Sequence, residues 1–199
     1  MKRLGLISVF LLCSFWLGAQ TQWRLALNKD GIKVWVPKNA DSRVQVFRAQ
    51  TVIEASNDDL LAMIRHAEKY PQWVAQVSDA KVVRKKSTND FIVWYEIAMP
   101  TGFTDRDVVL ENQVVKLKDG TMRINLVSRA NNYPVKKHMV RIDNAHGYWL
   151  FIPLSDNKTK VIYEFSADME MNLPLWMINK FLVNSPYKTL KNLRQWLEK

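Results

Sequence analysis

Residues 174–199 read PLWMINKFLVNSPYKTLKNLRQWLEK, and this stretch predicts the helix that ends the chain. Its first half is apolar on nearly every side: Leu175, Trp176, Met177, Ile178, Phe181, Leu182 and Val183. A helix of that kind must be covered on most sides. Its second half carries a single apolar stripe at helical spacing: Tyr187, Leu190, Leu193 and Leu197. We expect this half to lie on a surface, with its other face in solvent.

Two prolines set limits on this helix. Pro174 lies where a helix can begin, whereas Pro186 lacks an N–H and would clash with the preceding turn of a continuous helix. Ser185 is a residue type that caps a restarted helix. We therefore expect a kink or short break near residues 184–186, in a helix long enough to cross a small domain.

The N-terminus has the three parts of a secretory signal peptide. Met1-Lys2-Arg3 is positively charged, Leu4 to Leu17 is apolar, and small residues precede Gln20. We predict cleavage after Ala19, so that residues 1–19 are a signal peptide, residues 20–199 form the mature domain, and the protein is periplasmic or secreted. The alternative is an uncleaved membrane anchor. The short apolar run, without a basic stop-transfer flank, argues against it.

Cys13, the one cysteine of the sequence, lies inside the predicted signal peptide. The preceding Phe10-Leu11-Leu12 lacks the small residue usual before a lipidated cysteine, so we do not expect a lipoprotein. The mature chain then has no disulfide, no thiolate metal site and no cysteine nucleophile. Loss of Lys2 and Arg3 would lower the formal net charge from +10 to +8, which still favours anionic surfaces.

Between these ends the sequence predicts strands joined by short connections. A hairpin is expected over residues 23–37, and further strands over residues 44–53, 80–86, 91–99, 107–117, 121–130, 139–144, 148–154 and 160–170. Asp119-Gly120 and Ala145-His146-Gly147 are expected to form turns. Ser56 caps a helix that runs to about His66, and a short helix or turn follows at Trp73. We expect one α+β domain, with the long C-terminal helix across a curved antiparallel sheet.

The sequence contains no motif for catalysis or cofactor binding. Its glycines form no phosphate-cradling loop, its histidines have no metal-ligand spacing, and no nucleophile elbow occurs. We therefore expect neither an enzyme nor a cofactor.

The basic residues lie mostly at strand ends rather than on one recognition helix: Arg84, Lys85, Lys86, Lys116, Lys118, Lys136, Lys137, Lys158 and Lys160. This placement argues against nucleic acid as a partner. Two interpretations of this basic rim stay open. It is a solvated rim, or it is a collar that attracts anionic lipid head groups.

Several short marks occur in a fixed order along the chain: Tyr70-Pro71-Gln72-Trp73, Arg106-Asp107 opening a strand, Gly147-x-Trp149, Pro174-x-Trp176-x-Ile178-Asn179 and Leu193-Arg194. In this order they resemble the START domain, the steroidogenic-acute-regulatory-related lipid-transfer domain, over residues 23–199. The resemblance implies a helix-grip fold, in which a bent antiparallel sheet wraps the C-terminal helix and leaves a tunnel for one hydrophobic molecule. Members of the family bind sterols, phospholipids, ceramides or other apolar cargo, usually without catalysis.

The resemblance also implies a set of tunnel-lining residues: Trp94, Glu96, Val108, Leu110, Asn112, Trp149, Tyr163, Met177 and Phe181. Glu96 is the candidate polar group, and it faces either the tunnel or the outside of the sheet. Some family members carry a cavity acid near Glu96 and a cavity arginine near Asn112. The asparagine puts such an acid–arginine pair in doubt here. Residues 105–107, Asp-Arg-Asp, are expected to form a salt-bridged structural turn.

Three functions compete. The first is a monomeric carrier of one lipid or sterol-like ligand, in transient contact with anionic membranes. The second is an enzyme on the same fold, a cyclase or dehydratase of a hydrophobic substrate, which would need an acid–base cluster in the cavity. The third is a binding module without cargo that docks a partner through its basic rim. The alternative to a cavity is a solid core that the bulky side chains fill completely.

Overall fold

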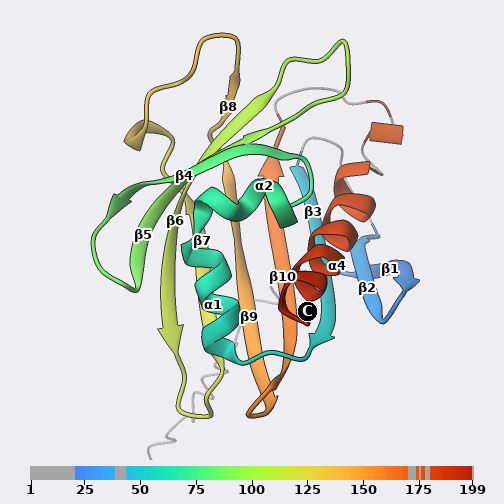
Figure 1. The fold of residues 1–199 in the computed structure, drawn as a ribbon. Coiled ribbons are helices and arrows are strands. Elements are labelled where there is room, and N and C mark those ends of the chain that lie inside the picture. The colour runs from blue at the N-terminus through green and yellow to red at the C-terminus, as the bar shows by residue number, and fades with distance from the viewer. Residues whose placement is uncertain (1–20, 39–43, 170–173, 175, 178–179, 199) are drawn as a thin grey trace, which may run out of the picture.

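The computed structural model describes residues 21–38, 44–169, 174, 176–177 and 180–198, and within these ranges the chain is built on one curved sheet (Figure 1). The sheet has ten strands, and nine of them follow the order β1-β2-β3-β10-β9-β7-β6-β5-β4 with antiparallel neighbours. The strands are β1 Trp23–Lys29, β2 Ile32–Pro37, β3 Val44–Ile53, β4 Val77–Lys85, β5 Asp90–Ile97, β6 Arg106–Lys116, β7 Met122–Ser128, β8 Val140–Ile142, β9 Ala145–Ser155 and β10 Lys158–Asp168. The predicted signal peptide lies outside the described residues.

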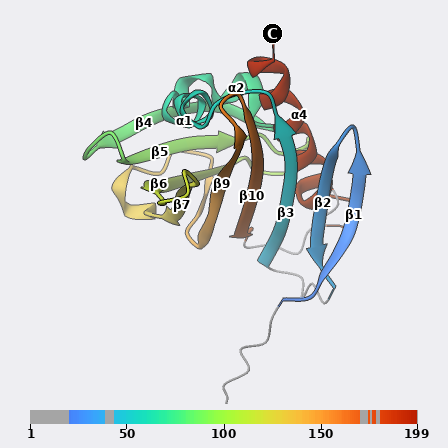
Figure 2. The ribbon, with the colours of Figure 1, turned by 90° about the horizontal axis from the view of Figure 1, so that it is seen from below.

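The helices gather on the concave face of the sheet (Figure 2). They are α1 Asn57–Arg65, η1 Ala67–Lys69, α2 Tyr70–Trp73, the π-helical turn η3 Lys180–Asn184 and α4 Ser185–Leu197, while η2 Ala130–Asn132 lies after β7. The start of α1 is fixed by a capping box between Ser56 and Asp59, whose side chains bond each other's backbone N–H groups. Leu60, Leu61 and Ile64 are buried, as an amphipathic helix on a sheet requires.

The C-terminal helix changes its hydrogen-bonding pattern at the place where Pro186 predicts a break. The π-helical turn ends at Asn184, and α4 begins at Ser185. Pro186 lies in the first turn of α4, where its missing N–H removes no helical bond. The predicted break therefore takes the form of a transition from π- to α-helix.

Polar contacts on both sides anchor α4. On one side, Tyr187 donates to the Asp30 carboxylate in the β1–β2 turn, and Arg194 donates to the Asp30 carbonyl oxygen at 2.9 Å. On the other side, the Thr189 hydroxyl accepts from the backbone N–H of Ala75 at 3.0 Å. Between these contacts, Leu190 and Leu193 are fully buried against the sheet. The sheet with its closing helix confirms the expected α+β helix-grip fold.

One strand pairs differently from the sequence prediction. β8 is a parallel neighbour of β6, with Val140 opposite Arg106, instead of an antiparallel partner of β9. Residues 145–147, predicted as a turn, are the first residues of β9. Gly147 permits a close approach there, because a Cβ atom would lie 2.3 Å from the carbonyl oxygen of Glu164 on β10. The glycine thus marks tight strand packing and not a chain reversal.

A buried ion pair fastens β8 and the segment before it to the convex face. Arg141 of β8 holds both carboxylate oxygens of Asp107 on β6, each at 2.8 Å. Trp94 of β5 donates its indole N–H to the same carboxylate at 2.8 Å. Arg141 also donates to the carbonyl oxygens of Ala130 and Tyr133. Such a bidentate, fully bonded pair is strong and geometrically specific.

We predict that Arg141→Met destabilises the protein by about 3–5 kcal/mol, because it leaves the Asp107 carboxylate buried without its cation. The measurement is the free energy of unfolding from a urea titration. The matched control is Lys116→Met, which breaks the exposed ion pair with Asp58 and should cost no more than about 1 kcal/mol. Equal losses in the two variants would contradict this assignment.

Candidate functional site

An apolar pocket lies between the concave face of the sheet and the start of the C-terminal helix. We call it the α4 pocket, and its cavity volume is about 90 Å³. Its lining includes Phe47, Ile97, Val108, Phe165, Ala167 and Met169 from the sheet side, and Phe181, Leu182, Pro186 and Thr189 from the helix. Bulky side chains from both layers converge here without filling the space between them.

A second, smaller pocket, the α2 pocket, lies under α1 and α2 and has a cavity volume of about 30 Å³. Its lining includes Ile64, Tyr70 and Trp73 from the helices, and Val93, Leu110, Asn112, Leu126 and Trp149 from the sheet. Both pockets share Val74, Tyr95 and Tyr163. These three residues are called the waist, because they separate two parts of one apolar interior.

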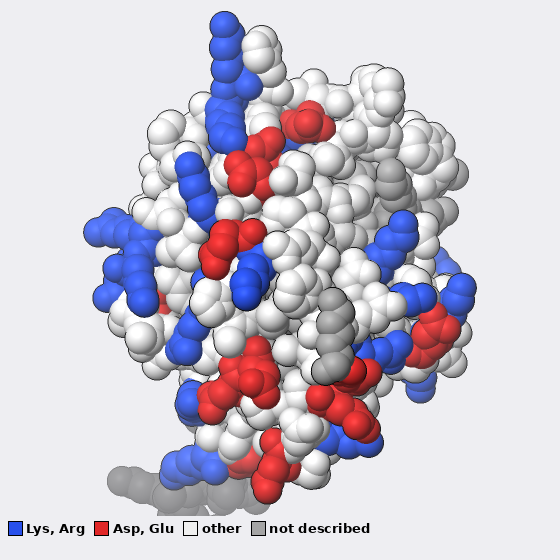
Figure 3. Space-filling view, viewed as in Figure 1, with Lys and Arg blue, Asp and Glu red and all other residues white. Residues whose placement is uncertain are grey.

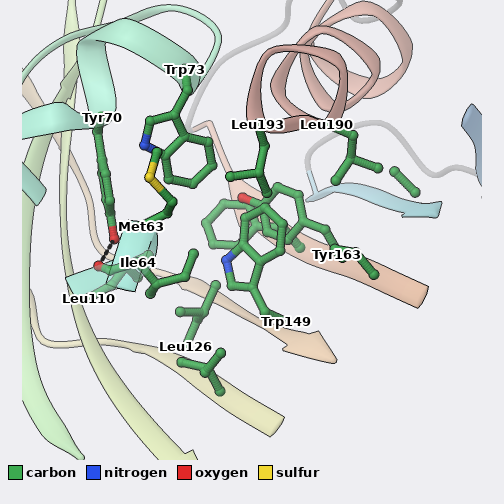
Figure 4. Packing of buried hydrophobic residues seen from close by; sticks show 14 of the residues in the cluster. Met63, Ile64, Tyr70, Trp73, Leu110, Leu126, Trp149, Tyr163, Leu190 and Leu193 are labelled. Atoms are coloured by element: carbon green, nitrogen blue, oxygen red, sulfur yellow. Dashed lines mark hydrogen bonds between the residues drawn. The ribbon is translucent and has the colours of Figure 1, made fainter. Parts of the chain in front are cut away.

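Aromatic packing fixes the position of the waist. The rings of Tyr163 and Trp149 stack with centroids 3.9 Å apart and planes 1° apart. Phe47 meets Tyr163 edge-on at 5.0 Å. Figure 4 shows Tyr163 beside Trp149, with Trp73 and Leu193 close to the pair. The parallel stack on Trp149 and the edge-on contact with Phe47 together orient the Tyr163 ring.

Three tyrosine hydroxyls lie in this interior. The Tyr70 hydroxyl donates to the Ile64 carbonyl oxygen at 2.7 Å (Figure 4). The hydroxyls of Tyr95 and Tyr163 have no hydrogen-bond partner among the residues that the structure describes. Burial raises the pKa of all three phenols, and for Tyr163 the nearby Tyr95 and Tyr70 raise it further. All three therefore stay protonated and neutral.

The lining of the two pockets carries no charge. Among the described residues, neither pocket is lined by Asp, Glu, Lys, Arg or His. The polar side chains present are neutral, and Asn112 uses its amide N–H on the Leu110 carbonyl oxygen at 3.1 Å. In the described ranges, no group of three or more His, Cys, Asp or Glu side chains is placed to hold a metal ion. None of the described helices is long and apolar enough to cross a membrane.

Six of the residues that the resemblance pointed to come together at these pockets. Val108 and Phe181 line the α4 pocket, while Leu110, Asn112 and Trp149 line the α2 pocket, and Tyr163 belongs to the waist. Met177 is fully buried in the core but lines neither pocket.

The structure places Trp94 and Glu96 on the convex face, so Trp94 does not line the interior and Glu96 takes the outward of its two expected orientations. Trp94 is fully buried there with Ile92 and Val109, under the ring of Tyr133. The Glu96 carboxylate pairs with Lys136 at 2.6 Å. Since side chains alternate along a strand, Val93, Tyr95 and Ile97 of β5 face the pockets instead.

Residues 105–107 have structural partners, and one of their contacts is a salt bridge. Asp107 pairs with Arg141, and the Asp105 carboxylate accepts from the backbone N–H of Met99 at 2.7 Å. Arg106 donates to the Thr104 carbonyl oxygen. These contacts close the loop between β5 and β6 beside the α4 pocket.

The comparisons with known proteins agree with this geometry. The family model of the START domain matches residues 17–199. The uncharacterized protein PA1579 of Pseudomonas aeruginosa is 29% identical, over 89% of this chain and 87% of its own. The crystal structure of a STAR-related lipid transfer protein from Xanthomonas axonopodis, a fragment, superposes with a TM-score of 0.80 at 28% identity, covering 89% of this chain and 99% of that one.

More distant structures share the fold alone. Human STARD10 has a TM-score of 0.74 at 20% identity, over 89% of this chain and 73% of its own. The Zhui aromatase/cyclase from Streptomyces sp. R1128 has a TM-score of 0.54 at 7% identity, over 78% of this chain and 94% of its own. The same sheet and helix thus occur in proteins described as lipid carriers and as cyclases.

Proposed function

The chain belongs to the START-domain family, whose model covers nearly its whole length, and from this membership we propose that it binds one lipid or sterol-like molecule between its sheet and C-terminal helix. The observation that carries the proposal is the apolar interior formed by the α4 and α2 pockets, whose described lining includes no charged side chain. Binding sites for apolar ligands are typically concave, mostly hydrophobic and supplied with a few placed polar groups.

Ligand binding requires this interior to expand. The α4 pocket, with about 90 Å³, is smaller than the roughly 300–1,000 Å³ typical of ligand sites. We propose that the segment before Pro186 moves outward while α4 stays in place. Contacts with Asp30 and Ala75 hold α4, and the π-to-α transition at Ser185 provides the hinge. The neighbouring loop of residues 100–104, with Gly102 at φ 91°, is proposed to open with it.

A non-catalytic carrier is the function that the lining favours over a cyclase or dehydratase. General acid–base catalysis needs a group whose pKa lies near the working pH. The ionisable groups in the lining are tyrosines, and burial raises their pKa away from that range. We further propose that the protein acts as a monomer after export to the periplasm or the extracellular space.

Transient contact with anionic membranes is proposed from the basic rim. Four of its residues pair with acids: Lys86, Lys116, Lys136 and Lys158. The other five, Arg84, Lys85, Lys118, Lys137 and Lys160, make no ion pair with any described residue. Figure 3 shows Lys and Arg side chains gathered at the left margin, over β4 and β5. Unpaired cations at a hairpin tip are free to meet lipid head groups.

The first prediction from the proposed function concerns the ligand. We expect purified protein to carry about one apolar molecule per chain, identified by mass spectrometry of its solvent extract. Phe181→Asp places a charge in the α4 pocket and should lower ligand uptake much more than stability. Leu193→Ala, at a buried site outside both pockets, should lower stability by about 2–5 kcal/mol and leave uptake by the folded fraction unchanged. Undiminished uptake in Phe181→Asp would refute the assignment of this pocket.

The second prediction concerns the membrane. Binding to vesicles that contain an anionic lipid should exceed binding to neutral vesicles and weaken with salt. Each basic residue near an anionic surface contributes about 1 kcal/mol, screened over roughly 10 Å at 0.1 M salt. The double variant Arg84→Gln, Lys85→Gln should lose more binding in a flotation assay than Lys116→Gln, whose cation is already paired. Binding that ignores lipid charge and salt would leave the rim with a role in solubility alone.

The third prediction concerns the N-terminus. Protein expressed from the full sequence should reach the exported fraction and begin at Gln20, because the first residues have the charge and hydropathy of a signal peptide. Edman sequencing of the exported protein measures this directly. A mature protein that still begins at Met1 would show that the segment is an anchor or is retained.

A further inference from the structure

We infer that the ligand is a neutral molecule with a hydrogen-bond-accepting oxygen, and that the hydroxyls of Tyr95 and Tyr163 hold this oxygen at the waist. The inference rests on the proposed function, since it specifies the ligand of the same interior. It adds a chemical class, namely long-chain or polycyclic ketones, alcohols and esters, as opposed to fatty-acid anions, phosphates and ammonium compounds.

The first argument is the position of the two hydroxyls. Tyr95 on β5 and Tyr163 on β10 come from strands far apart in the sheet order, yet both line both pockets. A molecule that occupies both pockets must pass the waist, where Val74, Tyr95 and Tyr163 line both of them. The third phenol, Tyr70, already donates to the Ile64 carbonyl oxygen. Tyr95 and Tyr163 are thus the two phenols whose donors remain available to a ligand.

The second argument is the character of the buried polar atoms near the pockets. Two pocket-lining residues each have a buried side-chain nitrogen without a partner among the described residues, Nε1 of Trp73 and Nε2 of Gln76, which an expanding interior would bring within reach of a ligand. Both are donors only. A buried donor without a partner costs about 1–3 kcal/mol. A ligand atom that accepts hydrogen bonds would remove such a cost, whereas a hydrocarbon would leave it in place.

The third argument is charge. A carboxylate or phosphate inside this interior would need a cation, and an ammonium group would need an anion or several carbonyl oxygens. The described lining offers neutral side chains only. The phenols stay protonated, because burial raises their pKa. A charged head group is therefore excluded from the waist, while a ketone, ester or hydroxyl oxygen fits its donors.

The test compares three sixteen-carbon probes delivered from a cyclodextrin carrier: 2-hexadecanone, hexadecane and palmitate, the last at a pH where its carboxylate is ionised. Affinity is measured by equilibrium partition of each probe between carrier and full-length mature protein. We expect the ketone to bind roughly tenfold more tightly than the alkane, which corresponds to two net hydrogen bonds of about threefold each. Palmitate should bind more weakly than the ketone.

Two variants locate the effect. Tyr95→Phe and Tyr163→Phe each remove one hydroxyl and keep the ring, so each should reduce ketone affinity about three- to fivefold and leave hexadecane affinity unchanged. The matched control is Tyr148→Phe on the convex face, where the lost hydroxyl bonds Glu164 at 3.0 Å. Tyr148→Phe should change neither the affinity for the ketone nor the affinity for hexadecane. Thermal unfolding of each variant verifies that it is folded.

The outcomes separate this inference from the proposed function. If the wild-type protein binds all three probes, but the ketone and the alkane equally, the inference is overturned and the lipid-binding function stands. Tighter binding of palmitate than of the ketone also overturns it, and this result comes from wild-type protein whatever the variants do. If no probe binds, the proposed function itself is overturned, and the inference with it.

Discussion

Burial of Leu190 and Leu193 against the concave face is the contact on which the rest of the structure depends. A sheet of this size exposes one continuous apolar face, and α4 is the element that removes the β3 part of that face from water. Asp30 and Ala75, at two turns far apart in the sequence, direct polar groups at α4 and so fix its orientation. The position of α4 then decides where the sheet and helix meet tightly and where space remains.

The space remains where large rings meet the start of α4. Tyr163 packs against Trp149 and Phe47, and the α4 pocket is lined by Tyr163 on the sheet side and by Phe181 on the helix side. The rigidity that aromatic stacking gives to the waist also keeps its hydroxyl in a defined position. The same contacts thus form the apolar wall and position the Tyr163 hydroxyl within it. This combination is suited to recognising a mostly hydrophobic molecule.

Local signals in the sequence predicted most of the fold. The Asp119-Gly120 turn, the cap at Ser56 and the stripe through Leu190 each involve residues close in sequence, and each is where it was expected. Which side chains of β5 point toward the pockets was not predictable from such local signals. Both faces of β5 are buried, so Ile92, Val93 and Trp94 give no alternation of polar and apolar residues.

The remaining differences have the same origin in long-range contacts. The partner of Asp107 is 34 residues away, and nothing near Asp107 in the sequence indicates Arg141. Gly147 has the composition of a turn, and only the approach of β10 reveals its use inside a strand. Tyr95, which lines both pockets, was not predicted, because placing Glu96 at the tunnel turns Tyr95 to the opposite face of β5.

The ion pair of Asp107 with Arg141 has a mechanical consequence. With β8 and the segment before it fastened outside, β5 and β6 carry layers on both faces, whereas β1 and β2 lie at the opposite end of the sheet from β4. The part of the sheet that carries a layer on both faces is therefore expected to resist bending. Volume added between sheet and helix should displace the segment before Pro186, while β5 and β6 keep their positions.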